Sequence, residues 1–317
     1  MKLNEVYNQW VVWKEMQVKR STILHYKNQY SQVIAPVFGD KELAELTKKN
    51  ILPEMYGWLE RGYSIKYCSD LLIILRMIMR YASDELEVDE VPNTTWKMIW
   101  PSYARKPNTG VMRYTKKEMQ TIIDYLTDNP SPKNLGILLV CCTGMRIGEI
   151  CGLRWEDVNI ECRLIHISRT LERVWDAEKK CSEIIMSSTK TQSSTRDIPI
   201  ISDIFQMVRN FSKTVRPDYY VCSGTEKPIE PRTFRNYYRE VILNKVGFDH
   251  VVKFHGLRHT FASSLIENGV DVKTTASILG HSNVATTLNV YAHPSEDSKR
   301  LAINRVLGRL IKTKKQD

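Results

Sequence analysis

Hydrophobic residues in the first part of the chain recur at helical spacing. Between residues 3 and 84, apolar side chains return every three or four positions, as Val6, Trp10 and Trp13 do, and this period marks one face of an α-helix. Breaks in the pattern occur at Phe38-Gly39-Asp40, at the cap candidate Thr47 and at Arg61-Gly62. The pattern therefore predicts a compact bundle of about four helices.

The rest of the chain mixes helical and strand-like patterns. Helices are predicted from the capping-box pattern Thr115-Lys-Lys-Glu118, the apolar run Leu135–Cys142, the start signal Pro231, the stop signal Gly269 and the basic tail after Pro294. Strand-like runs are Leu164–Thr170, Ile184–Ser187 and Arg196–Ile200. These runs fit one small antiparallel sheet. The predicted fold class is therefore mainly α with a small antiparallel β-sheet (α+β).

A proline-bearing stretch separates the two patterns. Between Val91 and Tyr114 the chain carries prolines 92, 101 and 107 with Asn and Gly around them, which favours an extended connection over a regular element. We therefore expect a helical domain at residues 1–100, a linker at 101–112 and a second domain at 113–317.

Composition narrows the class of protein. Hydrophobic residues make up 42% and charged residues 26%, as in soluble globular proteins. The longest apolar stretches, such as Gly136–Cys142, are too short to cross a bilayer, and the N-terminus lacks the pattern of a secretory signal. Seven cysteines without regular spacing fit a reducing compartment. We expect a cytoplasmic protein without a membrane partner, a bound metal or another cofactor.

The charge is distributed unevenly. Residues 1–100 hold equal numbers of basic and acidic side chains, so the formal net charge of +10 arises after residue 100. A polyanionic partner of the second domain is one explanation. The alternative is a basic surface that serves only solubility.

Four short segments carry residues suited to chemistry. They are Thr143-Gly-Met-Arg146-Ile-Gly-Glu149, Thr189-Lys190-Thr191 with Arg196-Asp-Ile-Pro199, His255-Gly-Leu-Arg258-His259, and Leu279-Gly-His281 followed by Tyr291-Ala-His293. Each segment alone has an ordinary structural reading, because arginines pair with nearby acids, histidines cap helices and tyrosines pack in cores. The occurrence of all four together points to one reaction.

That reaction is attack on a phosphodiester. Negative charge gathers on the non-bridging oxygens, and the forks of Arg146 and Arg258 suit that charge. A tyrosyl phenol forms a phosphate ester that keeps the energy of the broken bond, which makes Tyr291 the candidate nucleophile.

Proton transfer accounts for the other polar residues in these segments. Lys190, in a polar hairpin turn, is the candidate general acid for the departing 5′ oxygen. His255 and His281 are candidates to accept the phenol proton or to hydrogen-bond the developing charge.

In order and type, these segments resemble those of the tyrosine recombinase, or phage integrase, family. The resemblance implies the catalytic set Arg146, Lys190, His255, Arg258, His281 and Tyr291. Glu149 matches the acidic position that supports the first arginine, whereas His259 and His293 are expected to be structural. The chain is similar to short members that lack an arm-binding domain.

The resemblance also implies how DNA is held. The first domain is similar to the helical core-binding (SAM-like) domain of the family, and its candidate DNA-binding residues are Lys14, Lys19, Arg20 and Lys27. Such proteins clamp double-stranded DNA with inverted-repeat core sites, and a homotetramer exchanges strands through a Holliday junction. The C-terminal helix at Ser295–Leu310 is expected to dock on a neighbouring copy. Accessory directionality or DNA-bending proteins are possible partners, and a mobile genetic element is the expected context.

Two other functions remain compatible with these residues. A type IB topoisomerase uses a similar phenol, arginine and lysine set but rejoins the original ends. A DNA-binding regulator that kept the fold and lost activity would belong to a different functional class, since fold alone does not fix function. The motifs are equally compatible with integration, excision, inversion and dimer resolution.

Overall fold

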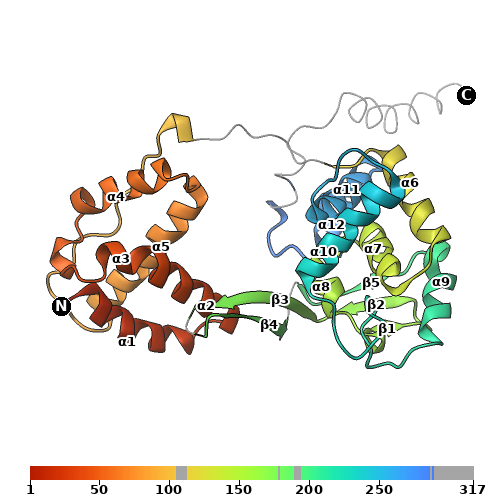
Figure 1. The fold of residues 1–317 in the computed structure, drawn as a ribbon, viewed down its shortest axis with the longest axis horizontal. Helices are drawn as coiled ribbons and strands as arrows, with labels where there is room; N and C mark the ends of the chain where they lie inside the picture. Colours follow the sequence, from red (N-terminus) through yellow and green to blue (C-terminus); the bar gives the residue numbers. More distant parts are fainter. Residues whose placement is uncertain (105–112, 178, 189–193, 286–287, 289–317) are drawn as a thin grey trace, which may run out of the picture. The chain divides into compact units, whose positions relative to one another are not determined.

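The structure is a computed structural model of the chain. It describes residues 1–104, 113–177, 179–188, 194–285 and 288. These described residues fall into two compact units, namely 1–104 with 173–177 and 179–185, and 113–172 with 186–188, 194–285 and 288. Both units are mainly helical, and the sheets are small (Figure 1). The predicted fold class is confirmed. Among the described residues, no helix is both long and apolar enough to cross a membrane.

The first unit is a helical bundle. Its helices are α1 (Leu3–Glu15), α2 (Arg20–Gln29), α3 (Ala35–Phe38), α4 (Lys48–Glu60) and α5 (Ile65–Asp84), with a π-helical turn at Tyr30–Ile34 and a 3₁₀ turn at Leu43–Glu45. The predicted breaks are confirmed, because α3 ends at Phe38, Thr47 is the N-cap of α4, and α4 ends before Arg61. Helix α5 supplies much of the apolar core, which also buries Trp10 and Trp58.

The stretch from Val91 to Pro101 packs against this core as an extended strap, and a 3₁₀ turn at Ser102–Ala104 follows it. Trp96, Met98 and Trp100 are partly buried against the bundle, whereas the alternate residues Lys97 and Ile99 are exposed. This period of two is that of an extended chain. The Arg76 guanidinium lies 4.7 Å from the Trp96 ring and donates a hydrogen bond to the Trp96 carbonyl. The extended conformation that the prolines favour is therefore held in place by side-chain contacts.

The second unit surrounds one buried helix. Its helices are α6 (Lys116–Asp128), α7 (Pro132–Thr143), α8 (Ile147–Gly152), α9 (Ser202–Ser212), α10 (Pro231–Glu240), α11 (Phe254–Glu267) and α12 (Val272–Leu279). Helix α7 is buried from Asn134 to Cys141 and contacts α6, α8 and α11, which explains its continuous apolar run. The predicted capping box of α6 is present, with Glu118 N donating to Thr115 Oγ1 at 3.2 Å.

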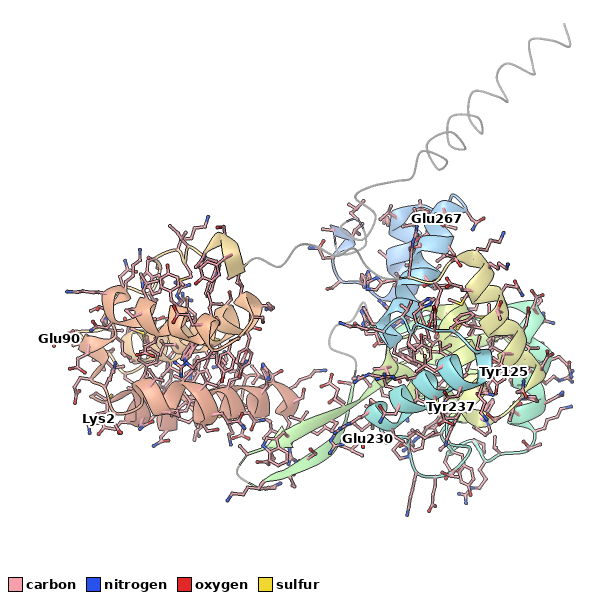
Figure 2. The ribbon with its side chains drawn as sticks, turned by 45° about the horizontal axis from the view of Figure 1, so that its top comes forward. Lys2, Glu90, Tyr125, Glu230, Tyr237 and Glu267 are labelled. Carbon is pink, nitrogen blue, oxygen red and sulfur yellow. The ribbon has the colours of Figure 1, made fainter. Side chains whose placement is uncertain are left out.

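Polar contacts tie the helices of this unit together. Tyr237 of α10 donates to Asn134 Oδ1 of α7 at 2.7 Å. Figure 2 labels Tyr237 together with Tyr125 of α6, Glu230, which is the N-cap of α10, and Glu267, which ends α11. Glu267 accepts a hydrogen bond from Arg113 at 2.6 Å, so the chain that leads into α6 is held to the far end of α11.

The strands form two sheets rather than one. Strands β1 (Val158–Asn159), β2 (Leu164–Ile167) and β5 (Arg196–Pro199) make an antiparallel sheet in the order β1-β2-β5, and β3 (Arg169–Asp176) pairs with β4 (Cys181–Ser188). The prediction of a single sheet was wrong. The run Leu164–Thr170 divides after Ile167, which pairs with Arg196 at the start of β5. A continuous strand-like run does not show where a strand changes partners.

Candidate functional site

The first predicted arginine begins helix α8. Arg146 is the N-cap, and its backbone N–H donates to Glu149 Oε2 at 2.8 Å while its Nη1 donates to Glu149 Oε1 at 2.7 Å. A carboxylate three residues into a helix is well placed for both bonds. The Glu149 side chain is 3% exposed and that of Arg146 is 36% exposed. The Thr-Gly-Met-Arg-Ile-Gly-Glu pattern therefore places a braced but accessible guanidinium at the start of α8.

The second predicted arginine is buried in helix α11. Arg258 is 2% exposed, and its Nη1 and Nη2 donate to the carbonyls of Gly144 at 2.8 Å and Leu279 at 2.7 Å. Burial, followed by the positive charge of Arg146, lowers the pKa of Arg258 to about 9. The guanidinium therefore remains charged at neutral pH, and each terminal nitrogen keeps a second hydrogen for another acceptor.

Both arginines, together with Arg196 of β5, bind the C-terminal end of α12. Gly280 caps this helix in the left-handed conformation, with φ +67°, which a residue without Cβ adopts readily. The last carbonyls of a helix lack intrahelical donors. Here Ile278 O accepts from Arg196 Nε at 2.7 Å, Leu279 O from Arg258 and Gly280 O from Arg146 Nη2 at 3.0 Å. We call these three carbonyls the carbonyl row.

Arg196 also belongs to this site, although the sequence motif Arg196-Asp-Ile-Pro199 gave the residue no role. It lies at the start of β5, its side chain is 7% exposed, and it binds Glu149 as well as the carbonyl row. A signal was present in the strand pattern, because Arg196 shares the inward-facing positions of an alternating strand with Ile198 and Ile200. A charged residue at such a position needs a buried partner.

Two predicted histidines lie beside these arginines. Partial burial, and after it the charge of His259 and Arg258, lowers the pKa of His255. Burial, then the charge of Arg258 and Arg146, lowers the pKa of His281 to about 4. Both imidazoles are therefore neutral at pH 7 and able to accept a proton. The rings of His255 and His259 meet edge to face, with centroids 4.7 Å apart.

The structure thus brings together four of the six predicted catalytic residues. Arg146, Arg258, His255 and His281 come from α8, α11 and the turn after α12, and their charges influence one another. Lys190, Tyr291 and His293 lie outside the described residues, as does the predicted C-terminal helix at 295–310. Their roles, like those of the four assembled residues, remain predictions.

A basic helix face adjoins His255. Arg232, Arg235, Asn236 and Arg239 of α10 are exposed, and their spacing of three and four puts them on one side of the helix. Three of these residues, Arg235, Asn236 and Arg239, line a cavity of about 760 Å³ together with Lys253 and His255. Side chains that donate hydrogen bonds and carry positive charge suit a polyanion.

The predicted DNA-binding residues of the first unit lie at the end of α1 and at the start and end of α2. Lys14 bonds Gln17 at 3.2 Å and lies over the Trp13 ring. Arg20 forms an ion pair with Glu183 at 2.6 Å within this unit. Lys19 is the N-cap of α2 and Lys27 lies in its last turn. The structure places these four residues near α2, and their binding role stays a prediction.

Comparisons with known proteins identify related chains. The model of the phage integrase family matches residues 112–298, and that of the phage integrase N-terminal SAM-like domain matches residues 2–52. A tyrosine recombinase XerC-like protein of Caldanaerobacter subterraneus subsp. tengcongensis is 28% identical over 310 residues, which cover 91% of this chain and 78% of the relative.

Solved structures have a similar fold. The Tn1549 transposon integrase in complex with transposon right end DNA is similar with a TM-score of 0.73 and 21% identity, over 97% of this chain and all of that chain. A lambda integrase tetramer bound to a Holliday junction is similar with a TM-score of 0.62 and 18% identity, over 93% of this chain and 80% of that chain. At these identities the likeness supports the two-domain fold.

Proposed function

Since this chain belongs to the phage integrase family, whose enzymes break and rejoin DNA, we propose that it is a site-specific tyrosine recombinase. It cleaves duplex DNA through a 3′-phosphotyrosine bond at Tyr291 and rejoins the strand to a new partner. The observation that carries the proposal is the convergence of Arg146, Arg258 and two neutral imidazoles on the turn after α12.

The arginines would hold the reacting phosphate. The Arg146 side chain is 36% exposed, and Arg258 retains free N–H groups after donating to Gly144 and Leu279. Two guanidinium groups offer planar pairs of donors to the non-bridging oxygens, where negative charge grows in the transition state. The carbonyl row fixes both groups before DNA arrives, so little reorganisation accompanies the reaction.

The proposed transfer conserves the energy of the phosphodiester. The Tyr291 oxygen bonds to phosphorus while the bond from phosphorus to the 5′ oxygen breaks. The phenol proton passes to His255 or His281, each neutral at pH 7, and the Lys190 ammonium protonates the departing 5′ oxygen. An incoming 5′ hydroxyl reverses these steps on the new strand. Because the ester stores the bond energy, the proposed reaction uses neither ATP nor a metal ion.

The proposed partner is double-stranded DNA with inverted-repeat core sites. The exposed face of α10 and the adjoining cavity offer Arg235, Asn236 and Arg239 to the duplex, and in the first unit Lys14, Lys19, Arg20 and Lys27 are the proposed contacts. We further propose a homotetramer that exchanges strands through a Holliday junction. The segment 295–310 would dock on a neighbouring copy, and accessory directionality or DNA-bending proteins would act on this assembly.

A trapping experiment tests this function. The full chain is incubated with EDTA and nicked duplexes that contain randomised sites, and the products are denatured in SDS. We expect a covalent protein–DNA adduct that survives EDTA and disappears in Tyr291→Phe. Tyr103→Phe is the matched control, because Tyr103 is 73% exposed in the first unit and should leave the adduct unchanged.

Other outcomes would favour the alternatives. Plasmid relaxation without exchange of products would favour a topoisomerase. Binding of DNA in a gel without any adduct would favour a catalytically silent regulator. An adduct that persists in Tyr291→Phe would exclude Tyr291 as the nucleophile.

A further inference from the structure

Hydrogen bonds to Glu149, Ile278 and Ser194 hold the Arg196 guanidinium. Its Nη1 and Nη2 bond Glu149 Oε1 and Oε2 at 3.2 and 3.0 Å, which is a two-pronged pairing of guanidinium and carboxylate. Its Nε donates to Ile278 O at 2.7 Å, and its Nη1 also donates to Ser194 O at 3.0 Å. The side chains of Arg196 and Glu149 are 7% and 3% exposed, so the pair is screened from solvent.

The pairing of Arg196 with Glu149 affects how much positive charge Arg146 can offer to a phosphate. Glu149 braces Arg146, but a carboxylate with no other partner would cancel much of the positive charge that a phosphate needs. Coulomb interactions are strong between buried groups. Arg196 balances the Glu149 charge from the buried side, where it cannot reach DNA. The more exposed Arg146 guanidinium is therefore left with its charge for an incoming anion.

The protonation state of Glu149 reflects this arrangement. Burial alone would raise the pKa of Glu149, but hydrogen bonds and charge from Arg196, followed by the charge of Arg146, hold it below its ordinary value. Arg258, on α11, also faces this carboxylate electrostatically. Without Arg196, the largest favourable contribution to the charged carboxylate would be lost, and the pKa of Glu149 should rise.

Arg196 also anchors the carbonyl row. It holds Ile278 O, while Arg258 and Arg146 hold the next two carbonyls along the chain. A Cβ at Gly280 would lie 2.9 Å from Arg196 Nη1, which shows how closely the guanidinium packs beneath the turn. A shift of Arg196 would therefore be passed to both proposed phosphate-binding arginines.

We propose that Arg196 is a positioning residue for phosphodiester cleavage, which balances the charge of Glu149 so that Arg146 keeps its own for the phosphate, and which fixes the carbonyl row. This inference rests on the proposed function. In this role Arg196 does not contact DNA. If Arg196 were only a structural brace, its removal would slow cleavage equally whatever the charge of Glu149. In the proposed role, the loss of cleavage rate depends on that charge.

The test compares single-turnover cleavage by full-length variants from pH 5.5 to 8.5, on one nicked duplex recovered with the wild type from the randomised pool. For Arg196→Gln we expect a loss of about 10- to 100-fold at high pH, the size of effect seen when groups that orient the ligands of a metal are removed. The loss, relative to wild type, should shrink as the pH falls, because protonation of Glu149 restores the free charge of Arg146. The ratio to wild type removes the titration of His255, whose pKa Arg196 does not affect. Loss of the Arg196 charge also raises the pKa of His281, and this effect is common to Arg196→Gln and to the double variant described next.

Further variants keep the proposal testable if Arg196→Gln folds poorly. Arg196→Lys retains the balancing charge, so its pH profile should follow that of wild type with a smaller loss. In Arg196→Gln/Glu149→Gln the unbalanced carboxylate is gone. This double variant should cleave faster at high pH than Arg196→Gln alone and should lack its pH dependence.

Arg169→Gln is the matched control. Arg169 is also a partly buried arginine, and it pairs with the buried Asp157 at 2.9 Å, away from the candidate site residues in sequence. Its loss should lower the melting temperature without producing a pH-dependent ratio. Two results would overturn the positioning role but leave the proposed function intact. One is a ratio of Arg196→Gln to wild-type cleavage rates that does not change with pH, and the other is a double variant that cleaves no faster than Arg196→Gln. Absence of any wild-type adduct would instead overturn the proposed function and this inference with it.

Discussion

A methyl group added at Gly280 should disturb the site through Arg196. In Gly280→Ala the new Cβ would meet Arg196 Nη1, Cδ and Cζ at 2.9, 3.1 and 3.2 Å, and the residue has φ +67°. Gly247→Ala provides the matched comparison, because Gly247 has φ +84° and nothing lies within 4 Å of its added Cβ. Both changes carry backbone strain, whereas only Gly280→Ala displaces a buried guanidinium.

The backbone strain and the displacement of Arg196 lower the free energy of unfolding by different amounts. An L-residue in the left-handed region costs about 1–2 kcal/mol, and the loss of unfolded-state freedom from glycine to alanine offsets about 0.4–1 kcal/mol of this. Displacing Arg196 weakens at least one charged hydrogen bond, worth roughly 1.5–3 kcal/mol. Gly280→Ala should therefore be less stable than Gly247→Ala by about that amount, which corresponds to a further fall in melting temperature of roughly 3–12 °C.

Thermal unfolding and DNA cleavage measure the two consequences. We expect a lower melting temperature for both variants, a larger fall for Gly280→Ala, and slower cleavage for Gly280→Ala alone. Equal melting temperatures for the two variants would refute the proposed packing of Arg196 beneath Gly280. Unchanged cleavage despite the larger loss of stability would refute the link from Arg196 to the arginines of the carbonyl row.

Two further predictions concern titration and buried polar groups. The His281 imidazole, titrated by NMR, should have a midpoint near pH 4 rather than the ordinary 6.5. Between these pH values the unfolded state binds more protons than the folded state, so the stability should fall as the pH drops from 6.5 to 4. A midpoint near 6.5 would contradict the burial and charge described. Tyr238→Phe should lower the free energy of unfolding in urea by about 1–3 kcal/mol, because Tyr238 bonds both Tyr114 Oη at 2.8 Å and Val252 O at 2.9 Å. Tyr103→Phe, at an exposed position, should change it little.

Much of the fold follows from periodicity and caps. The helical spacing of the first 84 residues and the Thr115–Glu118 capping box predicted elements that the structure contains. The division of the strand-like run after Ile167 was not predictable, because pairing partners depend on segments distant in sequence. The contacts that fix the extended strap after Val91 are likewise tertiary, as the Arg76 and Trp96 interaction shows.

The chemical types of the site residues could be predicted from the sequence, but their arrangement in space could be predicted only partly. Arg146 and Glu149 are close in sequence, so helix spacing suggested their contact, which the structure contains. The ion pair between Arg196 and Glu149 joins residues 47 positions apart, and no local pattern carries that information. The carbonyl row was also hidden, because it uses backbone atoms of Ile278, Leu279 and Gly280, which side-chain motifs do not show.

The three arginines around Glu149 have a consequence for the protein when it is alone. Arg146 and Arg196 pair with one buried carboxylate, and Arg258 also faces it. Burial lowers the pKa of Arg258 most, and the charges of Arg146 and Arg196 lower it further. An anion bound among them relieves the repulsion between these charges, and a ligand that binds only the folded state raises its stability. By itself the fold therefore lacks the part of its stability that a bound anion would supply. A phosphate backbone that binds among the three arginines would supply this part.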